Sequence, residues 1–198
     1  MDEVDGELDK EVMDGGTNLL KKLEEADVGP WLVIHGHKHF ASLSYGMTHG
    51  SCPPVLFSAG SLGALLYPQI KERTANQFYI LTIDINQTES TGRLVGQFES
   101  YSWNNMRGWH PSQSDFLPYK GGFGSQVTPH TLVIEILKLL ESTPYLDKND
   151  LVNIQDKIDY YTPSQFKELL GKMDKKGLFV DYDGNQIKEV VNNEKSNN

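Results

Sequence analysis

One short segment constrains this chain more than any other: an apolar run that ends at a glycine and is followed by two histidines. Residues 31–39 read Trp-Leu-Val-Ile-His-Gly-His-Lys-His. The run is rich in β-branched residues, and a glycine at its end allows a sharp turn at the edge of a sheet. Neutral imidazole is the commonest metal ligand, so His37 and His39, spaced i and i+2, could each reach one of two adjacent ions. The segment therefore predicts a metal site at the end of a strand.

Residues 36–39 resemble the last signature motif of the calcineurin-like metallophosphoesterases, which is a Gly-His-x-His at the end of a buried strand. In that family a Gly-Ser pair often follows after another short apolar strand, as it does here at 60–61. A helix precedes the motif strand, and residues 18–25 look like that helix. The resemblance covers residues 15–103. It implies an α/β fold, of which this chain would form the C-terminal part of the family's two-sheet α/β sandwich.

The resemblance also implies an activity, a metal requirement and roles for particular residues. Members are dinuclear metal-dependent phosphoesterases that hydrolyse a phosphomonoester or a phosphodiester with two divalent ions. His37 would ligate one metal and His39 the other, Gly36 would make the turn, and Mn²⁺, Fe or Zn²⁺ suits such ligands. No residue of this chain is assigned as catalytic. Lys38 and His49 are candidates for facing the phosphoester substrate, with simple solvent exposure as the competing interpretation.

The other metal-binding motifs of the family are absent from this sequence. It contains no Asp-x-His, no Gly-Asp-x-x-Asp and no Gly-Asn-His, and no histidine precedes His35. The chain is therefore expected to be the C-terminal piece of a longer enzyme, a split subunit that needs a partner chain, or a degenerate relative. The first is favoured. Two histidines without bridging carboxylates cannot hold two metal ions at the required spacing, so we expect the isolated chain to be inactive. His35 is expected to pack or hydrogen-bond in the sheet.

Composition limits the partners and the compartment. The net charge is −9, and residues 1–16 carry seven acidic residues against one lysine, which predicts a disordered start. There is no long basic stripe, so the usual electrostatic footprint of nucleic-acid binding is missing. The single cysteine, Cys52, suits a reducing cytoplasm, and no apolar leader is visible. The longest apolar stretch is too short and broken for a bilayer, so no membrane partner is expected.

Apolar periodicity and turn residues predict that residues 17–119 form the metallophosphoesterase part. A helix is expected at 17–26, and a polar turn at 86–92. Strands are predicted at 31–35, 40–45, 54–58, 77–85 and 93–101. Residues 102–119 are expected to cross the sheet irregularly, with Trp103 and Trp109 packed beneath it. Arg107 is a candidate phosphate contact, and an exposed surface position is the competing interpretation.

Beyond a linker predicted at 120–127, residues 128–191 are expected to form a separate module before a disordered tail at 192–198. Helices are predicted at 131–140, at 150–159 and from Thr162-Pro163 to Gly177, followed by a hairpin around 183–185. This pattern resembles a winged helix-turn-helix, so a small α+β winged-helix-like domain is predicted. DNA binding is not favoured, because no arginine follows Arg107. The alternative function is a non-catalytic binding or regulatory subunit that acts through this module.

Overall fold

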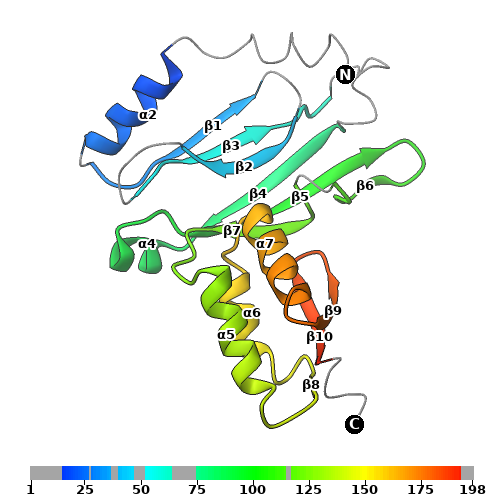
Figure 1. Ribbon diagram of the computed structural model, residues 1–198. Helices are drawn as coiled ribbons and strands as arrows, with labels where there is room; N and C mark the ends of the chain where they lie inside the picture. The colour runs from blue at the N-terminus through cyan, green and yellow to red at the C-terminus, as the bar shows by residue number, and fades with distance from the viewer. Residues whose placement is uncertain are drawn as a thin grey trace, which may run out of the picture.

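The computed structural model describes residues 15–26, 28–36, 40–46, 52–63, 75–114 and 117–192. Within these residues the chain is mixed α/β, with five helices and three small sheets (Figure 1). The helices are α2 (Gly16–Glu25), α4 (Ile85–Thr91), α5 (Pro129–Leu139), α6 (Val152–Ile158) and α7 (Pro163–Asp174). The strands are β1 (Leu32–Gly36), β2 (Ser42–Tyr45), β3 (Val55–Ala59), β4 (Gln77–Ile83), β5 (Gly96–Asn104), β6 (Gly108–Pro111), β7 (Lys120–Phe123), β8 (Tyr145–Leu146), β9 (Leu178–Asp183) and β10 (Gln186–Asn192). The predicted motif strand and the helix before it are confirmed. Most of the predicted acidic start and of the predicted tail lies outside the described residues.

The first sheet places the motif strand at its edge. Its order is β1-β3-β2, with β1 parallel and β2 antiparallel to β3. In the parallel pair Leu32 lies opposite Val55, and Gly36 lies opposite Ala59. The carboxyl ends of β1 and β3 therefore meet at the same edge of the sheet.

The second sheet is antiparallel and packs against the first. Its order is β4-β5-β6, and β7 also pairs with β5. Buried residues alternate along β5, so one of its faces enters the core. There Phe57 of β3, Phe98 of β5 and Phe123 of β7 are almost fully buried in one cluster. Phe57 also meets Tyr79 of β4 edge-on, with ring centroids 4.9 Å apart.

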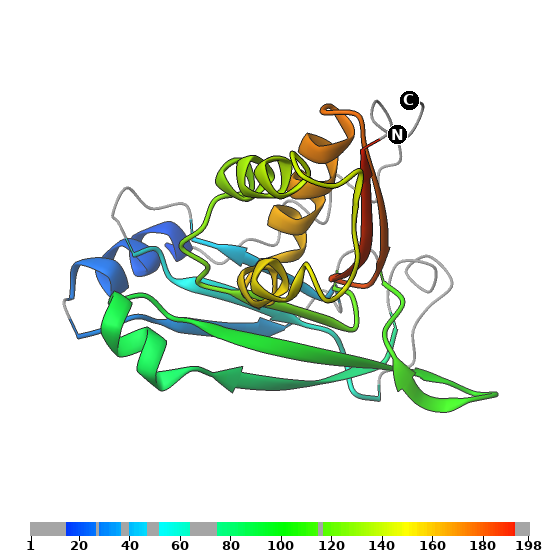
Figure 2. The same cartoon turned by 90° about the horizontal axis from the view of Figure 1, so that it is seen from below.

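Two expectations for this region were wrong. Residues 85–91 form α4 rather than a turn, because Asp84 caps the Gln87 N–H at 2.9 Å and Gly92 ends the helix at φ 66°. Trp103 and Trp109 do not pack beneath the sheet. They contact each other across β5 and β6, with centroids 5.4 Å apart, and are 44% and 40% exposed. Their hairpin extends away from the body of the molecule (Figure 2).

The C-terminal unit, residues 129–192, contains α5, β8, α6, α7, β9 and β10 in that order. Its antiparallel sheet has the order β8-β10-β9, and the predicted helices and hairpin are confirmed. Thr162 and Gln165 form the expected capping box at the start of α7. The unit has a core of its own, in which Ile136, Ile158 and Leu169 are completely buried.

The predicted linker at 120–127 was also wrong in part, because residues 120–123 are strand β7. Gly122 donates its N–H to the Tyr161 carbonyl at 2.8 Å, so the strand also joins the C-terminal unit. A Cβ on Gly122 would lie 2.2 Å from the Asp159 carbonyl oxygen. A glycine run that resembles a flexible connection here permits two backbones to approach closely. Tyr160 adds a side-chain contact by donating its hydroxyl to Asp84 at 3.0 Å. None of the helices in the described part of the chain is long and apolar enough to cross a membrane.

Candidate functional site

The candidate site is the edge of the first sheet where β1 and β3 end. A Cβ added to Gly36 would lie 3.3 Å from the Ala59 carbonyl oxygen, so any larger residue would crowd the neighbouring strand. Four residues later, the Phe40 carbonyl accepts a hydrogen bond from the Ser58 hydroxyl at 2.7 Å. Ser58 and Ala59 are consecutive at the end of β3. The chain therefore leaves β1 and returns at Phe40 beside the same strand end.

Five of the predicted site residues fall between positions 36 and 49 of the sequence. Gly36 is described, at the end of β1. His37, Lys38, His39 and His49 lie outside the described residues, so their predicted roles stay predictions.

His35 and Arg107, for which the sequence also suggested roles, both lie within the described part of the structure. His35 lies in β1 opposite Ser58, but its side chain is exposed rather than packed in the sheet, because β1 is an edge strand. Arg107 lies in the exposed turn between β5 and β6, where its backbone N–H donates to the Asn104 carbonyl at 3.2 Å. Within the described ranges, no three His, Cys, Asp or Glu side chains gather as metal ligands would.

The loop after β3 is held by a network that the sequence analysis missed. Gly60 donates its N–H to the Tyr79 hydroxyl at 2.7 Å, and that hydroxyl donates to Gln77 Oε1 at 2.9 Å. The Gln77 amide then donates to the hydroxyls of Ser102, at 3.0 Å, and Ser112, at 3.2 Å. Gln77, Ser102 and Ser112 are all buried, and satisfied polar networks of this kind fix one local structure.

Close packing around Gly60, the first residue of this network, leaves little room for a side chain there. A Cβ on Gly60 would lie 2.8 Å from the Tyr79 hydroxyl and 3.1 Å from Gln77 Oε1. The next residue, Ser61, accepts the Gln77 N–H at 2.7 Å through its carbonyl. Burial raises the pKa of the Tyr79 hydroxyl, with the Gly60 N–H acting in the opposite direction. Tyr79 therefore keeps the proton that it donates to Gln77.

This arrangement places two loop segments at one edge of the sheet. Gly36 and Phe40, the described residues on either side of the first, and Gly60, which begins the second, all lie at this edge. Periodicity predicted the strands, whereas the buried network joins residues up to 35 positions apart and has no local sequence signal. Comparisons with models of protein families, with curated proteins and with solved structures found no match for this chain.

Proposed function

We propose that the chain is the C-terminal part of a dinuclear metal-dependent phosphoesterase, similar to the calcineurin-like metallophosphoesterases, that hydrolyses a phosphomonoester or phosphodiester. The observation that carries the proposal is the parallel pairing of β1 with β3, which ends at Gly36 and Ala59. In open α/β sheets, ligands bind outside the carboxyl ends of parallel strands. The motif histidines and the Gly-Ser pair follow these two strand ends directly in the sequence.

In this proposal His37 and His39 each ligate one of two divalent ions, Mn²⁺, Fe or Zn²⁺. Such ions would polarise the phosphate and activate a water molecule. The chain's own contribution is to hold the ligand segment, through the Gly36 turn and the Ser58 bond to Phe40. These two histidines do not complete a dinuclear centre, and no catalytic step is assigned to the isolated chain.

The remaining ligands would come from an N-terminal half or a partner chain that lies against β1. Among the described residues β1 pairs only with β3, and its Ile34 side chain is 59% exposed. Parallel strands are usually buried between neighbours, because they occur in sheets covered on both faces. An exposed isoleucine on an edge strand therefore supports a further structural element on this side.

Metal titration tests the ligand assignment on the chain as it exists. We expect Zn²⁺ to shift the imidazole signals of His37 and His39 together in ¹H–¹⁵N spectra. Because each histidine ligates a different ion in this proposal, replacing one by alanine should weaken but not remove the shift of the other, whereas His130→Ala, an exposed position on α5, should leave both unchanged. The proposal fails if Zn²⁺ moves neither signal, or moves the His130 signal equally.

Activity and gene structure give a second test. We expect no measurable Mn²⁺-dependent hydrolysis of p-nitrophenyl phosphate or bis(p-nitrophenyl) phosphate by the purified chain. Readily measured turnover that His37→Ala abolishes would show that the chain completes a site by itself. Sequencing the transcript upstream of the Met1 codon should reveal the missing ligand motifs in frame or in an adjacent gene. Their absence would favour a degenerate relative.

A second candidate is a non-catalytic binding or regulatory subunit that acts through a winged-helix-like C-terminal unit. The order helix, strand, helix, helix, hairpin and the separate core favour this architecture. DNA is not the favoured partner, because Lys172 of α7 is paired with Glu168 at 3.3 Å and the chain is acidic overall. We expect no change in fluorescence anisotropy of a labelled random duplex at physiological salt with micromolar protein. Salt-sensitive binding that Lys167→Gln weakens would reverse this preference.

A further inference from the structure

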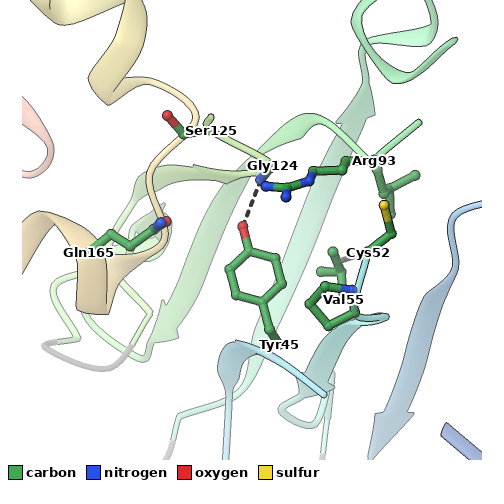
Figure 3. Close-up of a pocket in the computed structure, with 9 residues that line it drawn as sticks. Tyr45, Cys52, Val55, Arg93, Gly124, Ser125 and Gln165 are labelled. Carbon is green, nitrogen blue, oxygen red and sulfur yellow. Dashed lines mark hydrogen bonds between the residues drawn. The ribbon is translucent and has the colours of Figure 1, made fainter. Parts of the chain in front are cut away.

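A cavity of about 260 Å³ lies where the first sheet, the four-stranded sheet and α7 meet (Figure 3). Tyr45 at the end of β2, Val55 at the start of β3 and Gln165 of α7 all line it. Val55 begins β3 and Ala59, beside Gly36, ends it, so the cavity and the motif lie at opposite ends of this strand. Four residue steps along a strand separate them by about 13 Å. Its volume lies just below the range of about 300–1,000 Å³ typical of pockets for drug-sized ligands, so it suits a smaller molecule.

The cavity has one strongly charged group, the guanidinium of Arg93. A guanidinium has five N–H donors and no acceptor. Arg93 forms no ion pair with any carboxylate in the described part of the chain, although the chain contains 27 acidic residues. None of the described residues that line the cavity is acidic. The local charge is therefore positive in a protein whose net charge is −9.

Two neutral donors lie near this charge. The Tyr45 hydroxyl accepts the Gly124 N–H at 2.7 Å, and it has no acceptor for its own proton among the described residues. Burial raises the pKa of Tyr45, so the hydroxyl keeps that proton at neutral pH. Gln165 uses Oε1 to accept the Thr162 N–H at 3.0 Å, which leaves its amide NH₂ available. In Figure 3 the Tyr45 hydroxyl points to Gly124, and the Gln165 side chain extends into the same region from a different element.

Apolar side chains line much of the remaining wall, which Cys52, Gly124 and Ser125 complete. Val55 is almost completely buried, and Pro53, Leu94 and the ring of Tyr45 line the same space. A ligand that matches this surface carries an oxyanion at one end and an apolar group at the other. A single guanidinium balances one negative charge, so a carboxylate matches the site better than a phosphate dianion.

We propose that this cavity binds a small monocarboxylate that has an apolar body. The carboxylate accepts hydrogen bonds from the Arg93 guanidinium and the Tyr45 hydroxyl, and the apolar body lies against Pro53, Val55 and Leu94. Such a ligand would touch both sheets and α7 at once. This site is independent of the metal centre proposed at the other end of β3.

Binding of benzoate to the whole chain tests the proposal, measured by calorimetry and by ¹H–¹⁵N spectra. We expect Arg93→Gln to weaken benzoate binding about tenfold or more, because a charge-assisted hydrogen bond is lost. Arg107→Gln is the matched control, since Arg107 is exposed like Arg93 but lies beyond the far end of β5 and does not line the cavity. It should leave the affinity unchanged. Tyr45→Phe, which keeps the ring, should weaken binding several-fold.

Four outcomes would overturn the proposal. Benzoate fails to bind the unmodified chain, or Arg93→Gln binds it as tightly although its circular dichroism shows the native fold. Alternatively, both arginine variants lose affinity equally, which would indicate general electrostatic attraction. Inorganic phosphate that binds more tightly than benzoate and displaces it would make the cavity a phosphate site. The histidine titration with Zn²⁺ reports separately, so failure here and failure of the phosphoesterase proposal remain distinguishable.

Discussion

Replacing Gly122 by alanine distinguishes a flexible linker from a packed strand, because the two structures predict changes in stability of opposite sign. Alanine in a flexible connection would stabilise the protein by about 0.4–1 kcal/mol, since the unfolded chain loses freedom. In the structure the new Cβ would lie 2.2 Å from the Asp159 carbonyl oxygen and 2.6 Å from the Tyr160 Cα. Both are backbone atoms, so neither can rotate away as the end of a side chain could.

The free-energy cost of Gly122→Ala follows from the backbone movement that would relieve the clash. Overpacking of a rigid site typically costs about 1–3 kcal/mol and occasionally more. Relief requires β7 to separate from residues 159–161, which lengthens the Gly122–Tyr161 hydrogen bond of 2.8 Å and the Ser125–Tyr160 bond of 3.3 Å. Each lost bond adds about 0.5–1.5 kcal/mol. We therefore expect a loss of about 3 kcal/mol or more, a large fraction of a typical total of about 5–15 kcal/mol.

Urea denaturation followed by two probes measures this loss. All three tryptophans lie before residue 110, so their fluorescence reports on the paired sheets. Far-ultraviolet circular dichroism reports mainly on α5, α6 and α7. Gly171→Ala is the control, because its Cβ would meet nothing within 4 Å on α7, and helix propensity predicts a gain of about 1 kcal/mol. A Gly122→Ala variant as stable as the unmodified chain would refute the packed-strand interpretation.

Three further substitutions test buried hydroxyls and one carboxylate. Tyr79→Phe should lower stability by about 2 kcal/mol, because it leaves the Gly60 N–H without an acceptor, and hydrogen exchange at Gly60 should accelerate. Tyr161→Phe should be neutral or stabilising by about 1 kcal/mol in urea denaturation, because the buried Tyr161 hydroxyl has no partner within the described structure. The Tyr101 hydroxyl donates to Glu99 at 2.7 Å and, together with a lysine, holds the pKa of that carboxyl below its usual value near 4.5. The contribution of the ionised Glu99 carboxylate to stability is therefore complete at neutral pH and declines as the pH falls below about 5. Thermal melts of Glu99→Gln should depend less on acid pH than those of the unmodified chain.

The sequence predicted elements that carry a local signal and missed those that depend on distant partners. The capping box at Thr162 and the hairpin at 183–185 were predictable from a few adjacent residues, and both are confirmed. Helix α4 has no buried residue and consists largely of polar residues that also favour turns. Its only signals were the cap at Asp84 and the glycine at 92. Strand β7 contains Gly121 and Gly122, whose pairing depends on the backbones of β5 and residues 159–161.

The candidate site likewise combines features with a local sequence signal and features that depend on distant residues. The apolar run before Gly36 predicted a strand end, and the parallel partner of that strand is now known. The network from Gly60 through Tyr79 to Gln77 could not be predicted, because its members are separated along the chain by a segment that carries no pairing signal. The sequence likewise contained no indication that Arg93 would meet Tyr45 at a cavity, since 48 positions separate them.

Loss of the docking of the C-terminal unit should affect the two ends of β3 differently. Gln165 lines the cavity and belongs to the C-terminal unit, which is joined to β7 through residues 159–161, whereas Gly36 and Ala59 make their contacts within the first sheet. Gly122→Ala should therefore weaken benzoate binding several-fold and leave the Zn²⁺-induced shifts of the motif histidines unchanged. Both measurements belong on one sample at a urea concentration below the unfolding transition. If benzoate affinity survives while β7 separates from the C-terminal unit, the cavity does not need α7. If the histidine shifts disappear as well, the first sheet depends on this docking, and the two ends of β3 cannot be treated as independent sites.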